Sequence, residues 1–276
     1  MKRHLSGLIV LALGGLVCIA GVAADAVPQG TLAAANAAAA KPTPRVAGHP
    51  DLSGMWYRRV AGPVTQRVGK SIVRVTGQPD PEGSARSAYN PGTPKYKPGF
   101  LAKVKELKDD QINVDPSFQC GPPGVPRIGP PQRIIQTPRE IVILYDDLNG
   151  NFFRLVPTDG RTHRRGIEPS ANGDSIGRWE GDTLVIEVRS ILEDTWLGDN
   201  GLFHTADVKV TERLTRQGDT MKWEVIVEDP EVLVEPWKIT PRTLTLMTNA
   251  EIEEAPFCED RGVADRVTRD YHGNVR

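Results

Sequence analysis

The stretch that decides the fold runs from Val156 to Arg216 and reads VPTDGRTHRRGIEPSANGDSIGRWEGDTLVIEVRSILEDTWLGDNGLFHTADVKVTERLTR. Two apolar runs within it, 183–188 and 206–215, have strand character, and the segments between them are rich in Gly, Asp and Arg. Residues 180–182, Glu-Gly-Asp, are typical of a tight hairpin turn. Polar groups in such turns are held by a rigid sheet, and binding and catalytic residues concentrate in places of this kind.

The same pattern continues on both sides of this stretch. Asn149-Gly150 is a strong hairpin signal, and Gly218-Asp219 marks another turn. Strands are expected at 71–75, 133–136, 140–145, 152–156, 175–179, 183–188, 206–215, 221–227, 237–239 and 243–246. Because strand follows strand through short turns, we expect an all-β fold, an antiparallel meander rather than a βαβ array. Such a long sheet closes into a barrel or curves strongly, in a lipocalin-like form whose interior holds a small ligand.

One short helix and an irregular N-terminal part precede these strands. Residues 100–112 place apolar side chains at helical spacing, with Lys and Asp between them. Residues 77–98 are rich in Pro, Gly and Ser, which predicts an irregular segment.

The first residues have the features of an export signal. The basic Met1–His4 is followed by the apolar, uncharged Leu5–Val22 and by small residues at the cleavage positions. We therefore predict a signal peptide over residues 1–24 and a periplasmic or secreted protein. A retained membrane anchor is the alternative, since the apolar run is near the lower limit of a span, about 17 residues. A lipoprotein signal at Cys18 is disfavoured, because a valine precedes this cysteine.

Composition and charge define the remaining organisation. Residues 25–50 are rich in Ala and Pro and predict a flexible tether, and residues 51–276 predict a single β-rich domain. The net charge is −1, and the basic residues are spread along the chain. Nucleic acid is therefore not the expected partner, because phosphate binding needs a concentrated basic face. After processing, no stable membrane span is expected.

Two cysteines, Cys120 and Cys258, remain after removal of the leader. In an exported chain such a pair suggests one disulfide, which would stabilise the fold by about 4 kcal/mol. Two separate thiols are the alternative. No metal site is expected, because neither cysteine has CxxC or HxxxH spacing around it.

Several motifs of the chain occur in the same order as the motifs of a known family. They are Asp51–Trp56 (DLSGMW), Cys120–Arg127 (CGPPGVPR), Thr158–His163 (TDGRTH) and Ser175–Leu184 (SIGRWEGDTL). With these motifs the chain resembles a large family of exported bacterial proteins, mostly of unknown function, with PDLSGxW, CxPPGxPR, TDGRxH and SIGRWEGDTL motifs. The resemblance covers nearly all of the mature chain, but it implies no common reaction.

The chain also departs from the pattern of that family. Residues 170–172 are Ser-Ala-Asn where the family has a Trp before SIGRWEGD, and Lys209 stands where a histidine often occurs. A ligand or a reaction can therefore be specific to this member.

Four residues are candidates for proton transfer. A turn can place Asp159 against His163 and raise the basicity of the imidazole, and His204 precedes a long strand from a neighbouring loop. The two histidines are predicted to approach one cavity as a general acid/base pair. Strand alternation places Glu212 among apolar neighbours, where desolvation raises a carboxyl pKa. The alternatives are that His163 is an exposed loop residue and that Glu212 forms a buried ion pair with Arg178 or Arg154.

Four further residues are candidates for substrate binding. They are Arg161, Trp196, Tyr145 and Arg178. Trp196 lies in a Gly-containing loop beside acidic residues, where an aromatic ring can stack on a planar substrate. The alternative for Trp196 is a loop pinned to the core, and the alternative for Arg178 is a structural role.

The sequence predicts an exported, cofactor-independent enzyme acting on a small apolar or aromatic molecule. No G-x-S-x-G motif indicates a nucleophile. No G-x-G-x-x-G motif follows a strand, so a dinucleotide cofactor is not expected. Proton transfer alone suits a lyase or an isomerase. A non-catalytic periplasmic carrier with the same cavity is the first alternative, and a structural envelope protein is the second.

Overall fold

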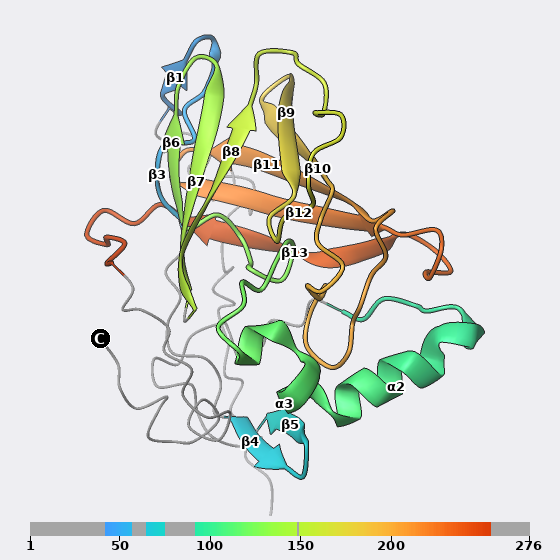
Figure 1. The fold of residues 1–276 in the computed structure, drawn as a ribbon. Helices are drawn as coiled ribbons and strands as arrows, with labels where there is room; N and C mark the ends of the chain where they lie inside the picture. The colour runs from blue at the N-terminus through green and yellow to red at the C-terminus, as the bar shows by residue number, and fades with distance from the viewer. Residues whose placement is uncertain (1–41, 57–64, 75–91, 148, 255–276) are drawn as a thin grey trace, which may run out of the picture. The chain divides into compact units, whose positions relative to one another are not determined.

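The structure, a computed structural model, describes residues 42–56, 65–74, 92–147 and 149–254. In these residues the dominant structure is antiparallel β-sheet, which confirms the all-β prediction (Figure 1). The segment predicted as a signal peptide lies outside the described residues, so that assignment stays a prediction.

The larger sheet contains five antiparallel strands in the order β13-β12-β11-β10-β9. These strands are β9 (Asp174–Glu180), β10 (Thr183–Arg189), β11 (Lys209–Gln217), β12 (Thr220–Glu228) and β13 (Trp237–Thr245). Each strand pairs with the next one along the chain, so this sheet is the predicted meander. Alternation places Val210, Glu212, Leu214 and Arg216 of β11 in the buried set.

The smaller sheet contains four antiparallel strands in the order β3-β6-β7-β8. They are β3 (Gly54–Met55), β6 (Arg133–Gln136), β7 (Glu140–Asp147) and β8 (Gly150–Pro157). Ile141, Ile143 and Tyr145 of β7 are fully buried, whereas the residues between them are half-buried. One hydrophobic cluster joins these side chains to Leu184 and Ile186 of the larger sheet.

Short helices cover residues 98–118. They are η1 (Pro98–Phe100), α2 (Leu101–Asp109), α3 (Gln111–Val114) and η2 (Pro116–Phe118). The single helix predicted over 100–112 is interrupted at Asp110, whose backbone leaves the helical region with φ −116° and ψ 20°.

Two small hairpins complete the described structure. They are β1 (Arg45–Val46) with β2 (His49–Pro50), and β4 (Thr65–Val68) with β5 (Ser71–Arg74). The first hairpin lies inside the segment expected to be a tether. The His49 ring stacks on Trp179 with centroids 4.5 Å apart, and Arg45 pairs with Asp182 at 2.7 Å. These contacts attach residues 42–50 to the larger sheet, so the tether prediction does not hold for them.

Among the described strands, the two large sheets are joined by backbone hydrogen bonds on one side only. Met247, just after β13, donates its backbone N–H to the carbonyl of Met55 in β3 at 2.7 Å. On the other side β8 and β9 form no ladder with each other, so each has a free edge among the described strands. A Cβ on Gly177 of β9 would lie 2.9 Å from Thr158 Cγ2 and 3.0 Å from Val156 Cγ1, so the two strands are close at this point. None of the described sheets closes into the predicted barrel.

Candidate functional site

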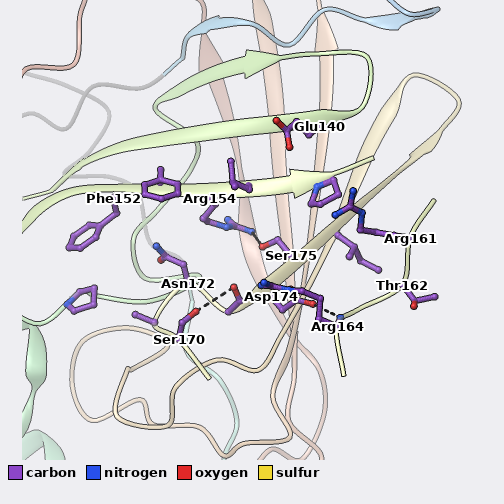
Figure 2. A pocket seen from close by; sticks show the side chains of 17 residues that line it. Glu140, Phe152, Arg154, Arg161, Thr162, Arg164, Ser170, Asn172, Asp174 and Ser175 are labelled. Atoms are coloured by element: carbon purple, nitrogen blue, oxygen red, sulfur yellow. Dashed lines mark hydrogen bonds and ion pairs between the residues drawn. The ribbon is translucent and has the colours of Figure 1, made fainter. Parts of the chain in front are cut away.

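A pocket of about 410 Å³ lies along the free edges of β8 and β9 (Figure 2). Its apolar lining includes Phe152, Phe153, Leu155, Pro157 and Ile176, and its polar lining includes Arg154, Arg161, Arg164, Ser170, Asn172, Asp174 and Ser175. The volume falls within the range of small-molecule sites, about 300 to 1,000 Å³, and the lining combines apolar side chains with a larger number of polar ones.

Arg154, on β8, is buried and connects strands of both sheets. Its Nη1 donates to the Tyr145 hydroxyl and its Nη2 donates to Ser175 Oγ, each at 3.1 Å. The same Nη2 lies 2.6 Å from Glu212 Oε2, in an ion pair whose two side chains are each 1% exposed. Trp223 Nε1 donates to Glu212 Oε1 at 3.0 Å. One guanidinium therefore holds together side chains from β7, β8, β9 and β11, with β12 attached through Trp223.

Two of the predicted site residues, Tyr145 and Glu212, belong to this network. The buried ion pair considered for Glu212 is present, and its partner is Arg154. Burial lowers the pKa of Arg154, but Glu212 and Tyr145 outweigh this effect and hold that pKa above its usual range. The guanidinium therefore stays charged. Arg178, the other partner considered, lies on the surface and pairs with Glu180 at 3.0 Å.

The Tyr145 hydroxyl is expected to make stability fall in alkali. Burial raises the pKa of Tyr145 to about 12 from a usual value of 10.0, while Arg154 acts in the opposite direction. The unfolded chain loses the Tyr145 proton near pH 10, whereas the folded protein keeps it. The stabilisation of the folded state by this hydroxyl is therefore complete below pH 10 and is lost as the pH rises toward 12. The loss amounts to about 2 to 3 kcal/mol. In urea unfolding at increasing alkaline pH, Tyr145→Phe should reduce this loss, and an unchanged slope would contradict the assignment.

Two buried polar atoms of the pocket have no hydrogen-bond partner among the described residues. They are Arg154 Nε, a donor, and Asn172 Oδ1, an acceptor. A buried polar group without a partner costs about 1 to 3 kcal/mol. A carboxylate or carbonyl oxygen of a ligand can accept from Arg154 Nε, and an amide N–H or a protonated carboxyl group can donate to Asn172 Oδ1.

His163 lies between two carboxylates beside the pocket. Its Nδ1 is 2.8 Å from Asp174 Oδ2, and its Nε2 is 3.2 Å from Glu187 Oε1. Arg164 Nε donates to Asp174 Oδ1 at 2.8 Å. Burial raises the pKa of Asp174, but the hydrogen bonds from His163 and Arg164 outweigh burial and hold this pKa below its usual range. Asp174 lines the pocket, and His163 touches it through this carboxylate rather than directly.

Asp159 does not orient His163, which corrects the prediction from the sequence. The turn folds Asp159 onto Arg161, whose Nε and Nη2 donate to it at 2.9 and 2.6 Å. These bonds hold the pKa of the Asp159 carboxyl well below its usual range. The carboxylate that contacts Nδ1 of His163 is Asp174, at the start of β9. Arg161, a candidate substrate-binding residue, lines the pocket.

His204 is a core residue that the structure does not bring to the same pocket as His163. Its side chain is buried, with Nε2 3.1 Å from Thr195 Oγ1 and Nδ1 2.9 Å from the Thr205 carbonyl. The backbone N–H and the hydroxyl of Thr205 both donate to the buried Asp229. Both ring nitrogens therefore have protein partners, and the predicted histidine pair is not assembled around this pocket.

Burial of His204 is expected to make stability fall in mild acid. Burial lowers the pKa of this imidazole from its usual 6.5, so the folded state resists a proton that the unfolded chain accepts. The contribution is complete above about pH 6.5 and is lost as the pH falls toward the lower folded value. His204→Gln should flatten the decline between about pH 6.5 and 5 in urea unfolding. An unchanged decline in His204→Gln relative to the wild-type protein would contradict this assignment.

Trp196 is pinned to the core, as the alternative interpretation proposed. Its side chain is buried, and the Arg127 guanidinium lies 5.9 Å from its ring centroid. Arg127 in turn makes two hydrogen bonds to Asp115, at 2.8 and 2.7 Å, and pairs with Asp199. Trp196 is not among the residues that line the pocket.

Sequence reasoning did not select Asp174, Asn172 or Ser175, and it named Arg154 only as an ion-pair partner. The sequence does contain a signal for Arg154. Strand alternation places this charged residue on the same, inward-facing side of an apolar strand as Val156, which indicates a buried charge. Asp174 and Asn172 carried no comparable signal, because their place depends on the path of residues 158–173.

Among the described residues no three His, Cys, Asp or Glu side chains are arranged to hold a metal ion. The helices of this part of the chain are all too short or too polar to cross a membrane. No protein-family model matches the sequence, and neither the curated proteins nor the solved structures contain a significant match. The resemblance to the exported bacterial family therefore stays a prediction.

Proposed function

We propose that the protein is exported and binds a small molecule with an apolar or aromatic body and a carboxyl or amide end. The observation that supports this proposal is the presence of an unpaired donor, Arg154 Nε, and an unpaired acceptor, Asn172 Oδ1, at one partly apolar pocket. The body of the ligand contacts the side chains of Phe152 and Ile176, which line the pocket from β8 and β9. In this proposal the strands wrap as an open, barrel-like sheet, and the binding site lies at its seam between β8 and β9.

Binding can be tested by quenching of tryptophan fluorescence with aromatic and terpenoid-like carboxylic acids and their methyl esters. We expect saturable binding of acids, and Arg161→Ala should weaken it about tenfold, because a charged hydrogen bond contributes about 1.5 to 3 kcal/mol. Arg178→Ala is the matched control: both arginines are more than half exposed and pair with a carboxylate two residues away, but Arg178 does not line the pocket. Equal affinity in both variants, or no saturable binding, contradicts the proposal.

A second candidate function is acid/base catalysis by a cofactor-independent lyase or isomerase. The observation that favours it is the contact of Asp174 with both the pocket and His163, whose ring is also close to Glu187. Asp174, which hydrogen bonds from His163 and Arg164 hold in its ionised form, accepts a proton from the ligand as a general base and then returns it. Loss of turnover in His163→Asn with ligand binding retained would support catalysis. Binding without turnover, unchanged between about pH 5 and 8, would identify a carrier.

A further inference from the structure

The outer face of the smaller sheet carries a patch of apolar side chains. Register aligns Ile135, Val142 and Leu155 across β6, β7 and β8, and it places Leu144 beside Phe153 in the next row. We call these five residues the outer patch. Ile135, Leu155 and Phe153 are 43%, 50% and 62% exposed. Contiguous exposed apolar side chains of this kind mark a surface that another segment or molecule covers.

The last described residues of the chain lie on this same face. Asn151 is exposed on β8 in the same phase as Phe153 and Leu155. Its Nδ2 donates to the carbonyl of Glu253 at 3.0 Å. Residues two apart on one face of a strand are separated by about 7 Å, so the chain reaches residue 253 immediately beside the outer patch.

We propose that the C-terminal segment, residues 255–276, docks on the outer patch through Phe257. An extended chain covers about 10 Å in three residues, so Phe257 can reach from Glu254 to Phe153. A second copy of the protein or a separate partner would also fit an apolar face. The C-terminal segment is favoured because it begins on this face, tied to it by Asn151.

Charge supports the same occupant. Arg133 of β6 is exposed and aligns with Leu144 and Phe153 across the sheet. Phe257 is followed within three residues by Glu259 and Asp260. A segment that places its aromatic ring on the outer patch therefore brings two carboxylates toward the one basic residue in that row. The inference does not rest on ligand binding, although Phe153 and Leu155 also line the pocket, so the docked segment borders it.

The test is photocrosslinking in the full chain with p-benzoylphenylalanine in place of Phe153, a change between two exposed aromatic side chains. We expect peptide mass spectrometry to find the crosslink within residues 255–276 of the same chain. Leu101, on α2, is the control because it is also exposed, at 54%, but lies outside the outer patch. The same probe there should give no crosslink to this segment.

Three results would overturn the proposal. They are a crosslink from position 153 to a second copy, a crosslink to another part of the chain, and equal crosslinking of residues 255–276 from positions 101 and 153. Phe257→Ser in the crosslinking protein should lower the yield at least about threefold. An unchanged yield would rule out docking through Phe257.

Discussion

Glu212→Leu is expected to lower the free energy of unfolding by about 3 to 5 kcal/mol relative to the wild-type protein. Glu212 and Arg154 are each 1% exposed, and their side chains lie 2.6 Å apart. Removal of the carboxylate leaves a buried guanidinium without its counter-charge and leaves Trp223 Nε1 without an acceptor. Arg154→Met should cost a similar amount, because it leaves Glu212 as the unpaired buried charge.

The double variant Arg154→Met with Glu212→Leu should recover most of this loss, because apolar side chains of similar volume can replace a buried pair without a penalty. Urea unfolding of the four proteins gives the coupling energy directly. Arg178→Ala and Glu180→Ala are controls from an exposed pair, each expected to change stability by less than about 1 kcal/mol. A cost below about 1 kcal/mol for Glu212→Leu would mean that the pair is not held as described. If neither single variant folds, recovery in the double variant remains measurable.

The sequence predicts the strands well because each strand carries its own signal. On β11 the alternation alone places Glu212 on the buried side with Val210 and Leu214, and the structure confirms this. Whether the two large sheets join into a closed barrel is not predictable in the same way. Closure depends on the hydrogen-bonding edges of β8 and β9, which lie side by side without a ladder. No local pattern in either strand encodes that relation.

The candidate site shows the same division between local and distant information. The sequence selected His163 and Glu212 from their immediate surroundings, and both lie in networks of charged groups. It assigned His163 the wrong carboxylate, because Asp159 is close in sequence whereas Asp174 is close in space. The path of residues 158–173 determines this contact, and turn-rich segments of that length have no periodicity to interpret.

A disulfide between Cys120 and Cys258 is the second large effect that we expect. Cys258 lies outside the described residues, but Cys120 and Glu253, which is five residues before Cys258, both lie near the hairpin of β7 and β8. Asn149 Nδ2, at the turn between β7 and β8, donates to the Ser117 and Gly121 carbonyls at 2.9 and 2.8 Å, so Cys120 lies beside that turn. Glu253 is bound to Asn151 at the same turn. The five residues from Glu253 to Cys258 extend to about 17 Å, which is enough to reach Cys120.

Loss of this bridge should lower the free energy of unfolding by about 4 kcal/mol, because it closes a loop of more than 100 residues. Urea unfolding with and without reductant measures the effect: the oxidised wild-type protein should lose this amount on reduction, and Cys258→Ser should not respond. Peptide mapping without reductant should recover residues 120 and 258 in one disulfide-linked pair, and two alkylatable thiols in the oxidised protein would show that the prediction is wrong.

The photocrosslink from position 153 distinguishes the effect of the disulfide from that of docking on the outer patch. If the crosslink persists in Cys258→Ser, apolar contact with the outer patch is sufficient to hold residues 255–276 there. If the crosslink disappears, the disulfide holds this segment and the apolar contact alone is too weak.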